Sequence, residues 1–281
     1  MKSAVADYRY RVLCLRIVPV VGAVVYLTDY VHDLVMSGHT YLTLSGYQFT
    51  GLNSPSDFSP SSIDLEGIVG AAGVTRAQVA SGLFDGARCY GFATTWKLPV
   101  EDEEPLTLGL FGKTTILDDR YRIGGVSLGD TLNRSTGKSY GAQCPKVFLS
   151  QTYAGCYVPA AANTVTGALT AVSSANIFTD SGRSEPSDTF GEGTIQFTSG
   201  PNAGLKALEI KAYASGVVET YEPFYYLPVI GNTYVMTRGC RKRSLDCKAR
   251  WNGTTTFNNI VNFGGYEFIP SGSTYAHVGG T

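Results

Sequence analysis

The feature that most constrains the fold of this chain is the alternation of apolar and polar residues in short runs that end at turn residues. In the extended stretch from Tyr8 to Val35, Tyr8, Tyr10, Val12 and Cys14 alternate with other residues, and an apolar run at 20–27 follows. Alternation of this kind is the period of a strand with one buried face. Gly22 and the Ser37-Gly38 pair are typical turn signals. Similar runs recur at 41–51, 61–68, 88–97, 113–123, 193–197, 204–214, 221–226 and 232–238. We therefore predict a mainly β fold.

Composition agrees with this prediction and limits the class of protein. The 281 residues include 33 Gly, 18 Tyr and 13 Phe, and only 16% are charged, against about 25% in an average chain. This length suits one large domain or two ordinary ones. With 22 basic and 23 acidic residues the net charge is -1. That balance excludes a whole-chain polyelectrolyte for nucleic acid, although it permits a local basic patch.

Two short helices are expected among the strands, so the predicted fold class is mainly β with two or more short helices. The first covers 75–82, where Thr75 is a suitable N-cap and Gly82 a stop signal, and the second covers 244–251. Residues 160–190 are rich in Ala, Ser, Thr and Gly, which predicts a long loop. We expect a β-rich N-terminal domain at 1–140 and a β-rich C-terminal domain at 141–281.

The sequence predicts synthesis and initial folding in a cytosol. No apolar run reaches the roughly 18 residues that span a bilayer, and Arg16 and Pro19 interrupt the most apolar stretch, 12–27. The first seven residues lack the apolar core and cleavage site of a secretory signal. In a reducing compartment the six cysteines are expected to be free, catalytic or bound to metal rather than paired in disulfides.

Enzyme motifs are weak in this chain, and we expect no enzymatic activity. Residues 109–114, Gly-Leu-Phe-Gly-Lys-Thr, resemble the end of a phosphate-binding loop, but Thr107 stands where that motif needs its first glycine. Residues 125–129 match the G-x-S-x-G nucleophile elbow, yet His277 is the only histidine that follows. A glycine-bracketed hairpin explains the second pattern better.

A group of polar residues between 29 and 39 could supply metal ligands. The group consists of Asp29, His32, Asp33 and His39. Zinc sites need four ligands in a tetrahedral set, and no further ligand set accompanies these residues. We therefore expect them to be the turn residues of a hairpin.

Four of the six cysteines are candidate metal ligands. Cys14 and Cys89 lie in apolar strand patterns and are expected in the core. The other four form two pairs along the chain: Cys144 with Cys156, and Cys240 with Cys247. Four thiolates can bind zinc tetrahedrally or hold a 4Fe-4S cluster. Zinc sites usually contain C-x₂₋₄-C knuckles, which are absent here, whereas the cube of an iron–sulfur cluster tolerates wider spacing because its iron corners are separated.

The second cysteine pair lies within a basic segment. Six cations fall within thirteen positions: Arg238, Arg241, Lys242, Arg243, Lys248 and Arg250. Only Asp246 opposes them locally. A cube with four thiolates is a net anion, so these cations would favour it. A solvated basic helix and a nucleic-acid contact are alternatives. Spacing alone leaves a cluster, zinc and unliganded thiols open.

The blocks around these cysteines resemble a known family. Residues 239–251 follow the pattern G-C-x-K-R-x-x-x-C-x-x-R-F, with Trp251 in place of Phe, and residues 259–270 follow N-x-x-N-F-x-G-x-x-x-x-P. Both resemble the tail-tip or baseplate hub proteins of long-tailed, siphovirus-type bacteriophages and gene transfer agents, a family related to the minor tail protein L of phage lambda. Further similar segments lie at 26–34, 83–87 and 197–204, while 160–190 lies outside the resemblance.

The resemblance implies a structural virion protein at the tail tip, made in the cytoplasm of a host bacterium. It implies a homotrimeric ring that joins the distal tail protein to the central tip or fibre protein around the DNA exit channel. Contact with the tape measure protein and transient contact with DNA in transit are compatible with this position.

The resemblance also implies a 4Fe-4S cluster. Its ligands would be Cys144, Cys156, Cys240 and Cys247, and the basic residues beside the second pair would neutralise it. Alternatives are a zinc-stapled structural protein and a tail-associated enzyme, either a wall hydrolase or an iron–sulfur oxidoreductase.

Overall fold

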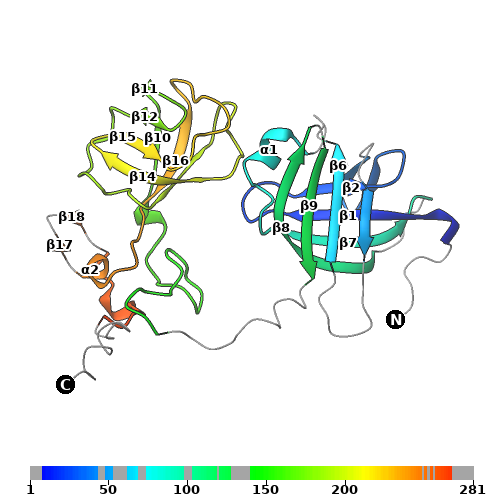
Figure 1. Cartoon of the computed structure of the whole chain (residues 1–281), viewed down its shortest axis with the longest axis horizontal. Coiled ribbons are helices and arrows are strands. Elements are labelled where there is room, and N and C mark those ends of the chain that lie inside the picture. Colours follow the sequence, from blue (N-terminus) through cyan, green and yellow to red (C-terminus); the bar gives the residue numbers. More distant parts are fainter. Residues whose placement is uncertain are drawn as a thin grey trace, which may run out of the picture. The chain divides into compact units, whose positions relative to one another are not determined.

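The chain divides into two compact β units, which consist mainly of Met1–Ser135 and Thr136–Thr281 (Figure 1). We call them the first and second units. The computed structural model describes residues 8–43, 48–52, 62–68, 74–97, 103–118, 120–127, 140–248, 250–251, 254–255 and 257–267. The predicted mainly β class with short helices is confirmed. No helix in the described parts of the chain is long and apolar enough to cross a membrane.

The first unit is built on one sheet of nine strands, in the order β3-β4-β2-β1-β7-β8-β9-β6-β5. Neighbouring strands are antiparallel except β2 and β4, which are parallel. A short 3-10 helix, η1 (Tyr8–Tyr10), precedes the sheet. The strands are β1 (Arg11–Val18), β2 (Val25–Thr28), β3 (Leu34–Met36), β4 (His39–Thr43), β5 (Gln48–Leu52), β6 (Ser62–Ile68), β7 (Arg88–Thr95), β8 (Glu104–Leu117) and β9 (Arg120–Ser127).

Strand β1 contributes to two hydrophobic clusters because both of its faces are buried in its middle part. Successive strand residues point to opposite faces, so Cys14 and Leu15 face different clusters. One cluster contains Val12, Cys14, Leu34, Met36, Tyr41 and Phe92. The other contains Leu15, Ile17, Leu27, Val74, Val79, Phe84, Ala87, Cys89, Phe111, Tyr121 and Ile123. The sheet therefore curves enough for residues of β1, β8 and β9 to meet in one core.

Helix α1 (Arg76–Ala80) forms where the sequence predicts a helix. The Gln78 N–H donates to Thr75 Oγ1 over 3.3 Å, and the Thr75 N–H donates to Gln78 Oε1 over 2.9 Å. This reciprocal capping box fixes the first turn. After the helix, Gly82 adopts a positive φ of 71°, a conformation that glycine reaches without a Cβ clash.

The two enzyme-like motifs lie in strands. Residues 109–114 belong to the long strand β8, so no helix follows the Gly-Lys pair as a phosphate-binding loop requires. Gly125–Ser127 end strand β9, and the last two residues of that pattern lie outside the described residues.

The second unit contains a sheet of seven strands, in the order β10-β16-β13-β14-β15-β12-β11. All neighbours in it are antiparallel. The strands are β10 (Thr164–Ala168), β11 (Ala171–Val172), β12 (Ile177–Thr179), β13 (Thr194–Phe197), β14 (Leu208–Ala214), β15 (Val217–Thr220) and β16 (Thr233–Thr237).

The segment 160–190 is not the long loop that its composition predicts. It contains the 3-10 helix η3 (Ala161–Asn163) and strands β10, β11 and β12. These strands are short and poor in large apolar residues. They form because β10 pairs with β16 and β12 pairs with β15, so their backbone groups are hydrogen-bonded within the sheet. Leu169, Phe178 and Phe190 anchor the segment in the core of the unit.

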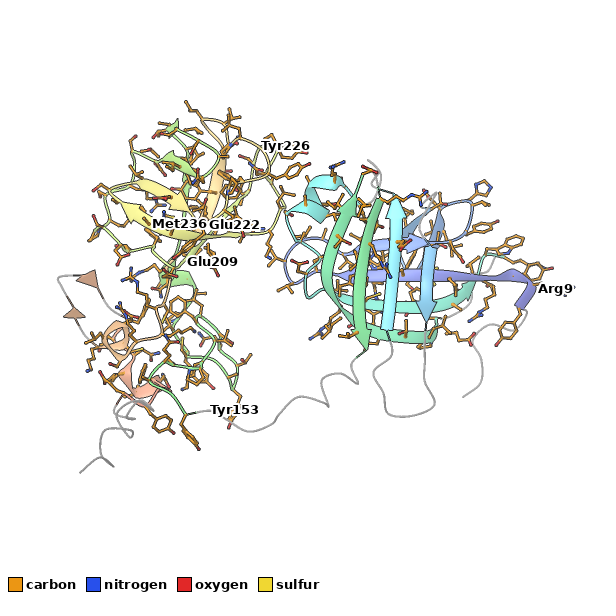
Figure 2. The ribbon with its side chains drawn as sticks, in the orientation of Figure 1. Arg9, Tyr153, Glu209, Glu222, Tyr226 and Met236 are labelled. Atoms are coloured by element: carbon orange, nitrogen blue, oxygen red, sulfur yellow. The ribbon has the colours of Figure 1, made fainter. Side chains whose placement is uncertain are left out.

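Aromatic side chains dominate the core of the second unit. The rings of Phe178, Phe197 and Phe224 lie 4.6–6.0 Å apart, centroid to centroid, in edge or tilted arrangements. Such pairs add to the free energy gained from burial. Met236 of β16 is fully buried in the same cluster (Figure 2).

Beyond the sheet, the second unit holds four short elements near its end. They are α2 (Ser244–Cys247), β17 (Arg250–Trp251), β18 (Thr254–Thr255) and η4 (Ile260–Asn262). The helix predicted at 244–251 is thus shorter than expected. Its C-cap is Lys248, which is extended, and the chain then forms the β17–β18 pair.

Replacing Phe178 with Ala should destabilise the second unit by about 3–5 kcal/mol, because the fully buried ring leaves a cavity. Urea unfolding would measure the loss. Tyr225→Ala removes an aromatic ring that is 44% exposed and should change the free energy of unfolding by no more than about 0.5 kcal/mol. Equal losses for the two variants would contradict this description of the core.

Cys14 and Cys89 should resist alkylation in the folded protein. Both side chains are fully buried, and burial raises the pKa of each thiol to about 12. The thiolate is the reactive form, so at pH 8 neither residue should react with iodoacetamide until the protein is unfolded in urea. Peptide mass spectrometry would measure this, and rapid native modification of either cysteine would refute it.

Candidate metal centre

A tight loop brings Cys156 back toward Cys144. The Val147 N–H donates to the Ala154 carbonyl over 2.8 Å, and the Cys156 N–H donates to the Val147 carbonyl over 3.1 Å. The turn leaves no room for a side chain at Gly155, where a Cβ would lie 2.0 Å from the Ser150 carbonyl oxygen. The loop therefore places both cysteines at one end of the 140–158 segment.

The segment 240–247 joins this loop through the backbone. The Cys144 N–H donates to the Lys242 carbonyl over 2.8 Å. Lys242 has a positive φ of 63°, and its own N–H lies 3.4 Å from Cys240 Sγ. Helix α2 then carries Cys247, and the Asp246 carboxylate accepts the Arg243 N–H over 3.3 Å at the start of that helix.

Asn259 connects the two cysteine segments. Its side-chain amide donates to the Cys156 carbonyl over 2.6 Å, and its backbone N–H donates to the Cys247 carbonyl over 2.8 Å. Asn262 holds the Asn259 side chain in place by donating to its Oδ1 over 2.8 Å. Two cysteines that lie far apart in sequence are thus fixed to one residue.

All four predicted cysteines line one small cavity. Cys144, Cys156 and Cys247 are buried, and Cys240 is half-buried. The Gly264 N–H lies 3.4 Å from Cys144 Sγ, so two of the four sulfurs accept backbone N–H groups. No three His, Cys, Asp or Glu side chains in the described ranges are arranged around one point as ligands of a single ion.

The thiols of this cavity affect one another. Burial, as the largest cause, together with the other three cysteines and Asp246 raises the pKa of Cys247 to about 11. Burial also raises the pKa of Cys240, while the Lys242 N–H and ammonium act in the opposite direction. The surroundings of Cys240 and Cys247 therefore favour their neutral thiols, and a bound cation would favour their thiolates.

Three of the six cations in the basic segment pair with carboxylates of the second unit. Arg241 pairs with Asp188, Arg243 with Asp246 over 3.1 Å, and Lys248 with Glu267 over 3.6 Å. The Arg238 guanidinium lies 5.0 Å from the centre of the Phe257 ring. Lys242 and Lys146 are the two cations that line the cavity.

The polar residues at 29–39 make contacts with the backbone and with aromatic rings. Asp29 Oδ1 accepts the Leu13 N–H over 2.8 Å, and Asp33 Oδ1 accepts the Thr43 N–H over 2.8 Å. His39 stacks on Tyr26 with ring centroids 4.5 Å apart. Asp29, His32 and Asp33 lie in the connection between β2 and β3, which do not pair with each other, and His39 begins β4 of the β3–β4 hairpin. The prediction that all four are turn residues of one hairpin is therefore only partly right.

Sequence reasoning did not assign roles to three residues of the cavity region. Asn259 and Gly264 lie in the 259–270 pattern, which supports the family resemblance but does not indicate their contacts. Lys146 lies in no motif. Its position two residues after Cys144 was the available signal.

Family comparison places the chain among phage structural proteins. Residues 6–158 match the family described as baseplate hub protein, N-terminal attachment domain. Residues 188–272 match a second family, described as phage conserved hypothetical protein BR0599. The first match covers more than half of the chain, so the chain belongs to the baseplate hub family, and its location is the tail of a virion. One cysteine pair falls in each matched region.

A solved structure has a similar fold. It is a chain of the virion of a native gene transfer agent particle, with a TM-score of 0.72 and 20% sequence identity, and the match covers 94% of this chain and 89% of that chain. No individually curated protein sequence matches the chain.

Replacing Gly155 with Ala should distort the loop that carries Cys156 and cost about 1–3 kcal/mol, because the new Cβ would overlap backbone atoms. Thermal or urea unfolding would measure the cost. Gly141→Ala is the matched control, because a Cβ there meets nothing within 4 Å. If both variants were equally stable, the tight loop would be wrong.

Proposed function

We propose that this chain is a structural hub of a phage-type tail tip. In this proposal a homotrimeric ring joins the distal tail protein to the central tip or fibre protein around the DNA exit channel. Membership of the baseplate hub family supports a structural, non-enzymatic role and assembly with other tail proteins. The trimer, the named partners, contact with the tape measure protein and contact with DNA in transit follow from the resemblance and are part of the proposal.

The proposal includes a 4Fe-4S cluster held by Cys144, Cys156, Cys240 and Cys247. The observation that carries it is that these four cysteines, from two distant segments, line one cavity. The donor set fits: four sulfurs are available, two of them accept backbone N–H groups, and Lys242, whose positive charge acts on Cys240, lines the same space. Hydrogen bonds to sulfur and nearby positive charge both stabilise an anionic cluster.

The bound group would act as a cross-link rather than as a redox centre. A cubane presents four separated iron corners, and four cysteines spread around a cavity suit one thiolate at each corner. This chain's residues supply the rest: Asn259 fixes two of the cysteine-bearing segments, and the Cys144 N–H ties the loop to Lys242. Metal binding would then add to the stability of the second unit, because the unfolded chain cannot present the same site.

Anaerobic purification followed by iron, sulfide and zinc analysis tests the cluster. We expect a brown protein with about four irons and four sulfides per chain. One zinc per chain would support the zinc-stapled alternative, in which the same four cysteines form the cross-link around zinc. A metal-free protein with normal stability would refute a metal cross-link.

Replacing Cys247 with Ser should abolish the visible absorption, remove most of the iron and lower the unfolding temperature of the second unit. Removing one ligand of a structural metal site typically releases the metal, and with it the binding free energy. Cys89→Ala is the matched control, since Cys89 is buried in the first unit and should retain full iron content. Normal iron content in the Cys247 variant would contradict the ligand assignment.

A further inference from the structure

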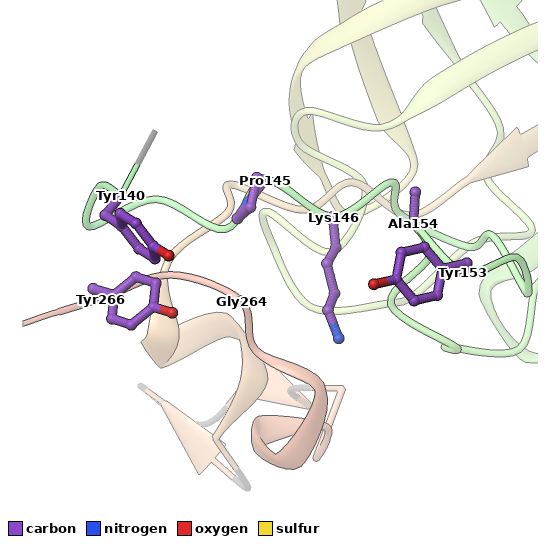
Figure 3. A pocket seen from close by; sticks show the side chains of 7 residues that line it. All are labelled: Tyr140, Pro145, Lys146, Tyr153, Ala154, Gly264 and Tyr266. Atoms are coloured by element: carbon purple, nitrogen blue, oxygen red, sulfur yellow. The ribbon is translucent and has the colours of Figure 1, made fainter. Parts of the chain in front are cut away.

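A second, larger cavity lies beside the cysteine cavity and has no role in the proposed cross-link. We call it the tyrosine pocket (Figure 3). Its volume is about 500 Å³, within the range of small-molecule sites. It is lined by Tyr140, Pro145, Lys146, Tyr153, Ala154, Gly264 and Tyr266. Lys146 lines both cavities, so the two are neighbours in the second unit.

Two tyrosines form a fixed corner on one side of the pocket. The rings of Tyr140 and Tyr266 lie 4.9 Å apart, centroid to centroid, at an interplanar angle of 75°. The Tyr266 N–H donates to the Gly141 carbonyl over 2.8 Å, and this bond joins the two segments that carry the tyrosines. Tyr153 lies across the pocket from this corner, with Lys146 between them (Figure 3).

The base of the pocket is closely packed. A Cβ at Gly264 would lie 3.3 Å from Lys146 Cγ and 3.4 Å from Pro145 Cδ, so the backbone of Gly264 rests directly on these side chains. The stem of Lys146 is thereby held against the chain while its ammonium extends into the space between the tyrosines (Figure 3). Binding would therefore cost little further ordering of the Lys146 stem.

The Lys146 ammonium is available to a ligand. Within the described parts of the chain it has no ion-pair partner, whereas the nearby carboxylate of Glu267 already pairs with Lys248 over 3.6 Å. The Lys242 ammonium donates to the Lys146 carbonyl, so the bond between these two lysines uses the Lys146 backbone and not its side chain. The pocket thus offers one positive charge among aromatic walls.

We propose that the tyrosine pocket binds an acidic saccharide, by stacking a sugar ring on the tyrosine corner and pairing its carboxylate with Lys146. One tyrosine ring presents its face and the other its edge at this corner. This shape suits a puckered sugar ring, whose C–H groups can contact the negative face of the aromatic ring. The phenol groups can both donate to and accept from sugar hydroxyls. A single ammonium suits one carboxylate, since phosphate recognition usually adds an Arg fork or several backbone N–H groups.

The pocket opens to solvent, so it can take a unit within a polymer rather than only a free sugar. Tyr140, Tyr153 and Tyr266 are 66%, 89% and 51% exposed. Figure 2 shows Tyr153 at the surface of the second unit. This inference goes beyond the proposed hub role, and it requires neither the cluster nor the ring.

Titration calorimetry with the full chain, purified with whatever metal it holds, tests the proposal. The probe is trigalacturonic acid, and the neutral comparison is maltotriose. We expect the acidic trisaccharide to bind at least ten-fold more tightly than the neutral one. Raising the salt concentration should narrow this difference, because the ammonium–carboxylate pair is screened.

Two variants locate the site. Lys146→Met keeps the apolar stem and should weaken binding of trigalacturonic acid at least ten-fold, while Tyr266→Ala should weaken it at least five-fold. The matched controls lie outside the pocket in the same unit: Lys211→Met removes one exposed positive charge, and Tyr225→Ala removes one exposed ring. Both controls should bind as the unaltered chain does.

Metal content and circular dichroism, measured on each variant, separate lost binding from lost folding. A Lys146→Met protein with unchanged metal content and weakened binding supports the proposal whatever the metal is. Equal binding of both trisaccharides, unchanged binding by Lys146→Met, or no binding of trigalacturonic acid at millimolar concentration would overturn it. Equally tight binding of oligothymidylate would also overturn it, in favour of a nucleic-acid site.

Discussion

The arrangement of the cysteine cavity depends on the two hydrogen bonds that Asn259 donates. One reaches Cys156, 103 residues earlier in the chain, and the other reaches Cys247. A single hydrogen bond contributes only about 0.5–1.5 kcal/mol net, so neither bond could hold these segments alone. They act together with the bond from Cys144 to Lys242 and with the tight turn at Gly155. The position of the sulfurs is therefore a property of the whole folded segment, not of any one loop.

Local patterns in the sequence predict much of the fold because strands and caps are set by near neighbours. The alternation around Val12 and Cys14 predicts β1, and Thr75 with Gly82 predicts the limits of α1. The same reasoning is wrong for 160–190. The strands there contain small residues, and their pairing with β16 and β15 comes from parts of the chain that are distant in sequence.

In the candidate site, too, the residue types could be predicted from the sequence, whereas their contacts with distant residues could not. Residue type indicates the four cysteines as a set, although it leaves their metal open. The partners of the basic run could not be predicted, because Asp188 and Glu267 reach Arg241 and Lys248 only in the folded unit. Lys146 was missed for the same reason, since the backbone of Gly264 holds its stem.

The long separation between Cys156 and Asn259 has a consequence for how the protein is made. A ribosome releases residues in order, and the first two cysteines emerge well before the chain that completes their surroundings. A product that stops before residue 259 would contain all four thiols but would lack the residue that joins their segments. Completion of the cavity therefore requires that synthesis has passed residue 259, and a subunit that stops earlier would differ in the interior of its second unit.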